Sequence, residues 1–308
     1  ELAVAGSHGQ TVFHHDGDPR GGTLQCGDPS LVAALLGIPV VGDFRWGDLA
    51  AGGQGAPLSP FADWTLHRRS EAPLAILNLG GIANLTLLEG EAPPRAWDAG
   101  PANGPLDALV RMETGRAFDR DGELSREGRV LGPLLERLQG DPFFRRPLPR
   151  STGLERFGAP LARKLRSWVP QAPLADLLAT LIELCAWSVQ ASLEQASLES
   201  AGWKGVPMVL CGGGAHHPGL RAALERRLAP GIGLKPYSSL GWDPDLREAV
   251  AFALLADAAL CGEPAVWPSS SGARRPAVLG CWARPPFLDP SPPFSMMLPT
   301  VAARLADC

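Results

Sequence analysis

The chain has 308 residues, of which 45% are hydrophobic and 19% are charged, and its formal net charge is -4. This length favours two domains, and the apolar fraction excludes an intrinsically disordered chain. The 28 Lys and Arg against 32 Asp and Glu exclude the basic surface that binds nucleic acid or anionic lipid, so we expect small-molecule partners, no nucleic acid and no membrane.

The cysteines and histidines of the sequence form no disulfide or metal-binding pattern. The six cysteines are scattered without a CxxC pair, which indicates free thiols and a cytoplasmic location. No uncharged apolar stretch of about 18 residues and no signal-peptide pattern is present, so we predict no membrane insertion. The pairs His14-His15 and His216-His217 lack partners at a metal-ligand spacing, so we predict no protein metal site.

The first third of the sequence alternates short apolar runs with glycine-rich turns. A first strand is predicted to end before Gly6, and a buried strand is predicted over residues 37–44. Residues 50–57 are predicted to form a loop.

The middle of the sequence predicts a hairpin and two helices. Strands are expected at Leu74–Leu79 and Ala83–Leu88, joined by a Gly80-Gly81 turn that permits positive φ. Apolar residues at helical spacing predict one helix over Asn103–Gly115 and a long core helix over Leu174–Leu198.

The last third predicts a βα unit, one more helix and a tail. A strand at Val206–Cys211 is followed by three glycines, Gly212 to Gly214, and by a helix from Pro218. Residues 246–260 form a further predicted helix. Because strands and helices alternate, the fold class is α/β. Prolines crowd the end of the chain, so residues 281–308 are predicted to form a Pro-rich C-terminal tail.

Two glycine turns are candidate nucleotide contacts. Gly80-Gly81 and Gly212-Gly213-Gly214 each follow an apolar strand, and glycine lets backbone amides approach an anion or a flat ring closely. Each turn alone is weak evidence, because a tight structural turn explains a pair of glycines equally well.

Two titratable residues are candidates for the chemistry. Asp98 lies in the segment "WDAGPANG", where its carboxylate is predicted to be in a loop and to act either as a general base or as a cap or solvated group. His8 lies in the loop "GSHGQT", where a histidine is either a cleft residue or a structural one.

Eight sequence blocks resemble, in order, the motifs of the anhydro-N-acetylmuramic acid kinase family. They are "GSHGQTV" (6–12), "GDFR" (42–45), "AAGGQGAPL" (50–58), "LNLGGIANLT" (77–86), "DAGPANGPLDA" (98–108), "RSTGLERF" (150–157), "CGGGAHHP" (211–218) and "EAVAFALLA" (248–256). The resemblance implies a two-lobed actin-like ATPase fold built from RNase H-like lobes. It assigns residues 1–73, with part of 261–280, to the first lobe and residues 74–260 to the second.

The resemblance also implies a reaction and its site residues. Members of the family use ATP, Mg²⁺ and water to open the 1,6-anhydro ring of anhydro-N-acetylmuramic acid and to phosphorylate O6 in cell-wall recycling. Asp98 matches the catalytic base. The residues expected to bind the sugar are His8, Gln10, Arg45 and Asn103, and those expected to bind the nucleotide are Gly80, Gly81, Asn84, Gly212, Gly213 and Gly214.

The chain also departs from the family pattern. No segment matches the N-terminal first phosphate loop, "GTSxDGxD", so the first lobe is expected to be incomplete at its N-terminus. Where the family string reads "DTGPGN", this chain has Ala99 in place of the threonine and Ala102 in place of the second glycine. Ala102 would be strained if it had to adopt positive φ. A truncated sugar-binding homologue with weak or no catalysis is therefore an alternative function, and a kinase of an ordinary hexose is a third. The sequence leaves a homodimer open.

Overall fold

The computed structural model describes residues 3–14, 22–70, 72–196, 206–228 and 232–285. The chain divides into two compact units, Glu1–Arg68 with Asp245–Cys308 (unit 1) and Arg69–Pro244 (unit 2). Helix α10 (Arg247–Cys261) packs with unit 1, whereas the sequence prediction placed residues 246–260 in the second lobe. Its packing partners there are strand β1 (Ala5–Gly6) and helix α3 (Ser59–His67).

Unit 1 contains a small mixed sheet of three strands. The central strand is β4 (Val40–Gly42), which pairs in parallel with β1 and antiparallel with β10 (Cys281–Ala283). Residues 281–283 therefore belong to this sheet, which corrects the prediction that the tail begins at residue 281. Residues 286–308 of that predicted tail lie outside the described residues.

The strand predicted over residues 37–44 is shorter in the structure. Asp43 adopts φ 54°, and helix α2 (Phe44–Ala50) starts immediately after it, so Phe44 packs in the core from a helix. The remaining elements of unit 1 are β2 (Gln10–His14), β3 (Thr23–Cys26), α1 (Pro29–Leu36) and α11 (Pro268–Ser271).

Close packing and a buried ion pair fix α10 within unit 1. A Cβ on Gly6 of β1 would lie 2.1 Å from the carbonyl oxygen of Phe252, so only glycine permits this approach. On the other side, the Arg247 guanidinium donates to both carboxylate oxygens of Asp63 in α3, at 3.2 and 2.6 Å. Both side chains are buried, so the pair joins the two helices with directional bonds.

Unit 2 is built on a five-stranded sheet in the order β7-β6-β5-β8-β9. The strands are β5 (Leu74–Leu79), β6 (Ile82–Leu88), β7 (Arg95–Pro101), β8 (Met208–Cys211) and β9 (Leu234–Pro236). Strand β6 is antiparallel to both of its neighbours, and β8 and β9 run parallel to β5. In order along the chain this is 3-2-1-4-5, the arrangement of an RNase H-like sheet, so the α/β class is confirmed.

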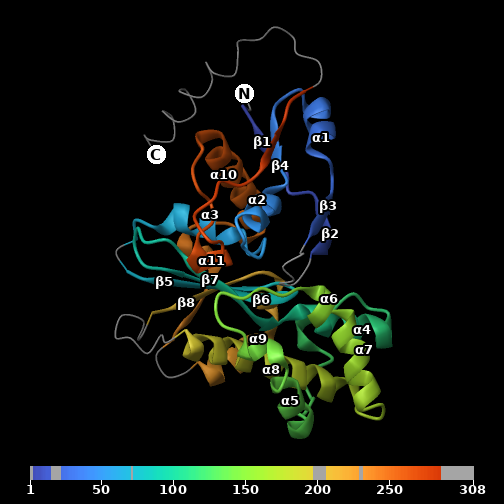
Figure 1. The fold of residues 1–308 in the computed structure, drawn as a ribbon. Helices are drawn as coiled ribbons and strands as arrows, with labels where there is room; N and C mark the ends of the chain where they lie inside the picture. Colours follow the sequence, from blue (N-terminus) through green and yellow to red (C-terminus); the bar gives the residue numbers. More distant parts are fainter. Residues whose placement is uncertain (1–2, 15–21, 71, 197–205, 229–231, 286–308) are drawn as a thin grey trace. The chain divides into compact units, whose positions relative to one another are not determined.

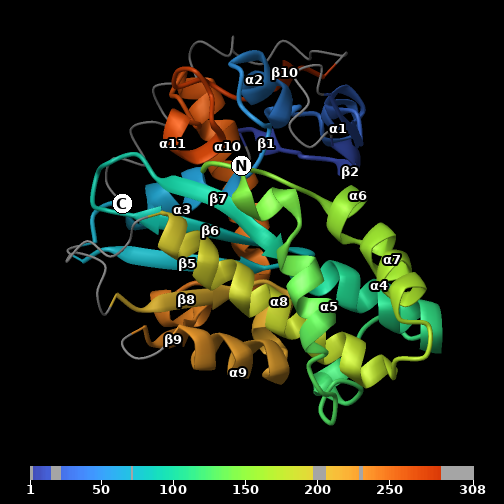
Figure 2. The ribbon, with the colours of Figure 1, turned by 60° about the horizontal axis from the view of Figure 1, so that its bottom comes forward.

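Helices cover one face of this sheet (Figures 1 and 2). They are α4 (Asn103–Thr114), α5 (Gly132–Gln139), α6 (Leu154–Phe157), α7 (Ala159–Trp168), α8 (Leu174–Gln195) and α9 (Pro218–Arg227). Unit 2 also has 3₁₀ turns at Arg120–Gly122, Pro142–Arg145, Gly213–His216 and Tyr237–Leu240, and a further turn, Pro244–Leu246, lies at the boundary of the two units. Alternate residues of the strands point to this face, and they form one hydrophobic core with the helices.

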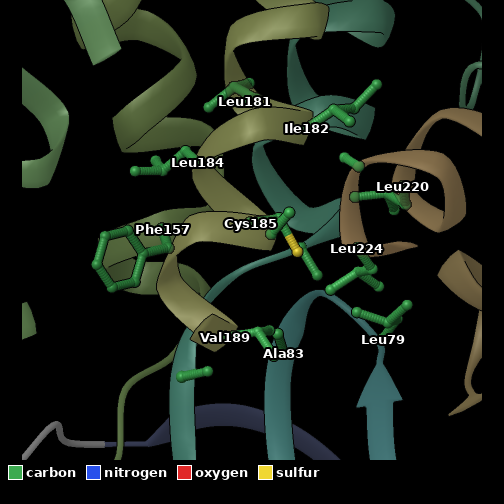
Figure 3. Close-up of a cluster of buried hydrophobic side chains, with 14 of the residues drawn as sticks. Leu79, Ala83, Phe157, Leu181, Ile182, Leu184, Cys185, Val189, Leu220 and Leu224 are labelled. Atoms are coloured by element: carbon green, nitrogen blue, oxygen red, sulfur yellow. The ribbon is translucent and has the colours of Figure 1, made fainter. Parts of the chain in front are cut away.

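The long helix α8 runs through the middle of that core. Its residues Leu181, Cys185 and Val189 meet Leu224 of α9 and Leu79 of β5 in the same cluster (Figure 3). By length and composition alone α8 could also span a membrane. However, twelve of its residues are buried against the sheet and the neighbouring helices, which identifies it as the core helix that the sequence predicts.

Candidate functional site

Asp98 lies in the middle of strand β7, so the prediction that it is in a loop is wrong. Its side chain is 4% exposed, and its Oδ2 atom accepts hydrogen bonds from the Ser151 hydroxyl at 3.1 Å and the Thr152 amide at 2.8 Å. The following helix α4 has no side-chain cap, so Asp98 does not cap it. A buried carboxylate held by two donors has a fixed direction, which is what a positioned acid or base requires.

Arg150 fixes the backbone on which Asp98 is carried. The amide of Asp98 donates to the Arg150 carbonyl at 2.8 Å, and the Arg150 Nε donates back to the Asp98 carbonyl at 3.2 Å. The guanidinium also donates to the carbonyls of Phe144 and Arg146 and to Gln195 Oε1. Burial lowers the pKa of Arg150 to about 10, which leaves the group charged at neutral pH.

A row of polar side chains crosses the sheet from Asp98. In the strand register Asp98 of β7 lies opposite Asn84 of β6, Asn84 lies opposite Asn78 of β5, and Asn78 lies opposite Cys211 of β8. Directly opposed residues share one face of a sheet, and the Cys211 thiol lies 3.6 Å from Asn78 Oδ1. The row therefore leads from the carboxylate to the two glycine turns. Sequence reasoning missed Asn78, although it stands in the block "LNLGG" two positions before Gly80.

The Gly80-Gly81 turn at the tip of the β5–β6 hairpin has two roles. Its carbonyls accept hydrogen bonds from the first amides of α4, those of Ala102, Asn103 and Gly104, at 3.0–3.1 Å. Neither glycine adopts positive φ, so the predicted reason for glycine here is wrong. The amides of Gly80 and Gly81 have no hydrogen-bond acceptor among the described residues, although the Leu154 side chain packs against Gly81, 2.8 Å from the position of a Cβ. They can therefore donate to a phosphate.

The second glycine turn lies at the same edge of the sheet, because β5 and β8 are parallel neighbours. Gly212 has φ 77°, and a Cβ there would lie 2.8 Å from the Leu79 carbonyl. A Cβ on Gly214 would lie 2.8 Å from the Leu79 side chain. The fold thus requires glycine at both positions. Gly213 is different, because it is exposed and a Cβ on it would meet only Asn103 Nδ2 at 3.8 Å.

A cavity of about 370 Å³ opens in unit 2 beside Gly213. The residues that line it are Asn103, Leu106, Asp107, Phe118, Asp119, Arg120, Asp121, Gly213, His216 and His217. Burial raises the pKa of the Asp107 carboxyl. Phe118 is exposed at this cavity, with the Arg120 guanidinium 5.7 Å from its ring centre. A flat ring, a carboxylate and a bare backbone turn suit a purine nucleoside.

Asn103 lines this cavity and belongs to unit 2, whereas His8, Gln10 and Arg45 belong to unit 1. It is the first residue of α4, and its Nδ2 donates to the Leu79 carbonyl at 3.2 Å. This contact joins the start of α4 to the end of β5, beside the second glycine turn. The geometry therefore groups Asn103 with the glycines predicted to contact nucleotide.

In unit 1, Arg45 and His14 lie close enough to His8 to influence its pKa. The His8 ring stacks on Phe252 of α10 at 4.6 Å, and its Nε2 lies 3.4 Å from the Thr11 hydroxyl. Burial, followed by the charges of Arg45 and His14, lowers the pKa of His8 from 6.5 to about 4. His8 is therefore neutral at pH 7, and its buried Nδ1 has no hydrogen-bond partner among the described residues.

Arg45 and Asp48 hold the glycine-rich loop predicted over residues 50–57. Arg45 donates to the Gly55 carbonyl at 2.7 Å, and Asp48 Oδ2 accepts the Gly55 amide at 2.6 Å. The Ser271 hydroxyl donates to Asp48 Oδ1 at 2.6 Å, and burial raises the pKa of the Asp48 carboxyl. Gln10, the third predicted sugar ligand in this unit, is exposed at the start of β2.

Comparison with known proteins decides the family. The family model described as "Anhydro-N-acetylmuramic acid kinase" matches residues 1–284. Curated proteins of that name are 44% identical in Gloeobacter violaceus (91% of this chain, 74% of that protein) and 43% identical in Streptomyces coelicolor (89% and 69%). This chain belongs to the anhydro-N-acetylmuramic acid kinase family.

Two solved structures are distantly similar to this chain. The activator of 2-hydroxyisocaproyl-CoA dehydratase from Clostridium difficile with bound ADPNP has a TM-score of 0.39 at 16% identity and covers 65% of each chain. The (R)-2-hydroxyglutaryl-CoA dehydratase component A of Acidaminococcus fermentans has a TM-score of 0.39 at 18% identity.

The backbone conformation at Ala102 bears on one departure from the family pattern. Ala102 replaces a glycine of the family string, and its backbone adopts φ -128° and ψ -112°. Its φ is negative, so the added Cβ does not impose the strain that positive φ would bring. The positive φ considered for this position is therefore not found.

Proposed function

We propose that the protein uses ATP and water to convert 1,6-anhydro-N-acetylmuramic acid to N-acetylmuramic acid 6-phosphate in cell-wall recycling, in the cytoplasm. The observation that carries this proposal is the oriented Asp98 carboxylate at one end of the polar row. The Gly212–Gly214 turn follows Cys211 at the other end, and the Gly80-Gly81 turn joins the two middle strands of the row. A base and a set of unpartnered backbone amides on one sheet are the parts that a coupled hydrolysis and phosphoryl transfer needs.

In this mechanism Asp98 takes a proton from the water that attacks the anomeric carbon C1. The bond between C1 and O6 breaks, O6 attacks the γ-phosphorus of ATP, and ADP leaves with the electron pair of the broken phosphate bond. The Gly80 and Gly81 amides would donate to phosphate oxygens, and the cavity beside Gly213 would hold the nucleoside. Preorganised donors of this kind stabilise developing charge without reorganising during the reaction.

We keep His8, Gln10, Arg45 and Asn103 as the proposed sugar-binding residues. His8 supports this role because it is neutral at pH 7 and has a ring nitrogen without a partner in the described structure. A neutral imidazole can donate to or accept from a sugar hydroxyl, according to its tautomer.

Mg²⁺ is proposed from the reaction and not from a set of ligands. Among the described residues no group of three His, Cys, Asp or Glu side chains is placed to hold a metal. Mg²⁺ in kinases is bound largely by substrate phosphates and water, with one or two carboxylates. When bound, it would neutralise charge on the phosphates.

The Asp98→Asn variant tests the proposed base. We expect kcat for ADP release in the presence of the anhydro sugar to fall by about 10³-fold or more, because an amide cannot accept the proton. ATP affinity should stay close to that of the wild-type protein. Turnover of the variant at the wild-type rate would exclude Asp98 as the base, and a wild-type protein without sugar-dependent ADP release would refute the proposed function.

A further inference from the structure

Two residues in the wall of the cavity, His217 and Asp119, have no role in the proposed chemistry. His217 is the residue before α9, and its Nδ1 accepts hydrogen bonds from the amides of Gly219 at 3.1 Å and Leu220 at 3.4 Å. An imidazole nitrogen that accepts two amides presents its lone pair. The ring proton of the neutral side chain is therefore on Nε2.

Asp119 lies in the opposite wall of the cavity and binds the backbone there. Its Oδ1 accepts the Leu124 amide at 2.8 Å and its Oδ2 accepts the Ser125 amide at 3.1 Å. His217 Nε2 lies 3.4 Å from Asp119 Oδ2, and both side chains are buried. The contact is close but is not an aligned hydrogen bond. It joins the start of α9 to the segment 118–125.

The backbone of segment 118–125 contains a bend at positive φ, which contacts from neighbouring residues must stabilise. Asp121 and Gly122 follow each other with φ 54° and 68°. A non-glycine residue in the left-handed region is strained and persists only where its surroundings fix it. The His217 ring packs against this bend, because a Cβ on Gly122 would lie 3.5 Å from His217 Cε1. The histidine therefore contacts the bend, the carboxylate of Asp119 and the first turn of α9.

We propose that His217 and Asp119 are positioning residues that hold the two walls of the nucleoside cavity at the spacing that binds the nucleotide. One wall carries Gly213 and His216, and the other carries Phe118 and Arg120. This inference rests on the proposed function, because it assigns the cavity to ATP. A histidine that serves only as a helix cap would stabilise α9 without setting nucleotide affinity.

Variants at position 217 separate these two roles. Asparagine is a good N-cap and accepts the α9 amides, but it is too short to reach Asp119, whereas alanine loses both contacts. We expect His217→Ala to lower Tm and to raise the KM for ATP by about five- to tenfold. The KM for the anhydro sugar and kcat should change by less than about twofold. His217→Asn should recover Tm while leaving the KM for ATP raised.

Asp119→Asn completes the test, with Arg221→Ala as the control. The double variant His217→Asn with Asp119→Asn should have the same KM for ATP as Asp119→Asn alone, because coupled residues are not additive. Arg221 forms an exposed pair with Glu225 on α9, and its replacement should change neither Tm nor KM. Calorimetric titration with ADP supplies an affinity that does not depend on turnover.

The outcomes distinguish this inference from the proposed function. A wild-type protein that binds ADP without turning over the sugar refutes the reaction and leaves the positioning role measurable through ADP affinity. If His217→Asn restores both Tm and nucleotide affinity, the histidine is only a cap and the inference is wrong. A wild-type protein that does not bind ADP also contradicts it, because the cavity then holds no nucleotide.

Discussion

Asp98 illustrates how a side chain is oriented by residues distant in the sequence. Sequence reasoning found the residue, because it stands in a recognisable block, but assigned it to a loop. The contacts that orient it come from Arg150, Ser151 and Thr152, which belong to a block about fifty positions later. Which block pairs with which is decided by tertiary structure, so neither periodicity nor spacing could show it.

Replacement of Arg150 should destabilise the protein and reduce its activity. Arg150→Ala removes a buried guanidinium and leaves the carbonyls of Asp98, Phe144 and Arg146 without this donor. We expect the free energy of unfolding to fall by about 3 kcal/mol, and kcat to fall because the Asp98 backbone is released. Urea denaturation measures the first effect. Arg145→Ala, at an exposed position in the 3₁₀ turn Pro142–Arg145, should change stability by less than about 0.5 kcal/mol.

The lowered pKa of His8 predicts a pH dependence of stability. The unfolded chain binds a proton at His8 below pH 6.5, whereas the folded protein does so only near pH 4. The contribution of neutral His8 is therefore complete above pH 6.5 and is lost as the pH falls from 6.5 to 4. His8→Gln, which does not titrate, should show a smaller fall in Tm over this range. Parallel melting curves for the two proteins would contradict the depressed pKa.

At the scale of elements, apolar periodicity located most helices and strands. The hairpin β5–β6, helix α4, helix α8 and helix α10 all lie where the pattern predicts them. The roles of the glycines could not be predicted in the same way. Gly80 and Gly81 adopt no positive φ, and Gly212 is required by the approach of the Leu79 carbonyl. A close approach between two strands is a property of the folded sheet.

Gly213 is the glycine whose replacement separates binding from folding. A valine there meets little of the protein, so Gly213→Val should keep Tm within about 2 °C while lowering ADP affinity by about tenfold or more. Gly212→Val is the matched control, because its side chain would collide with the Leu79 backbone at positive φ and should destabilise the fold. Unchanged ADP affinity in folded Gly213→Val would mean that the turn does not contact nucleotide.

At the scale of the whole molecule, the chain contains two cores of different size. The cluster in unit 2 spans its sheet and six helices, whereas the clusters in unit 1 are smaller. The division of the chain could be predicted only in part. Helix α10 packs on β1, β4 and α3, elements that all lie before residue 68, and amphipathicity does not reveal which sheet a helix covers.

Core substitutions should report on the two units separately. Leu181→Ala in unit 2 and Leu255→Ala in unit 1 each remove a fully buried side chain, and each should cost about 2–5 kcal/mol. We expect hydrogen exchange to accelerate in β5 and β8 for the first variant and in β4 and α10 for the second. Equal acceleration throughout the chain in both variants would show that the units unfold as one.

The parallel pairing of β5 with β8 predicts an order of events during folding. Asn78 and Cys211 are neighbours in the sheet but 133 positions apart in the chain, and pairings of such long range form late. The β5–β6 hairpin can form early, yet the cavity beside Gly213 exists only after β8 has docked. A nucleotide bound there therefore recognises the completed sheet, and it should slow unfolding without accelerating folding.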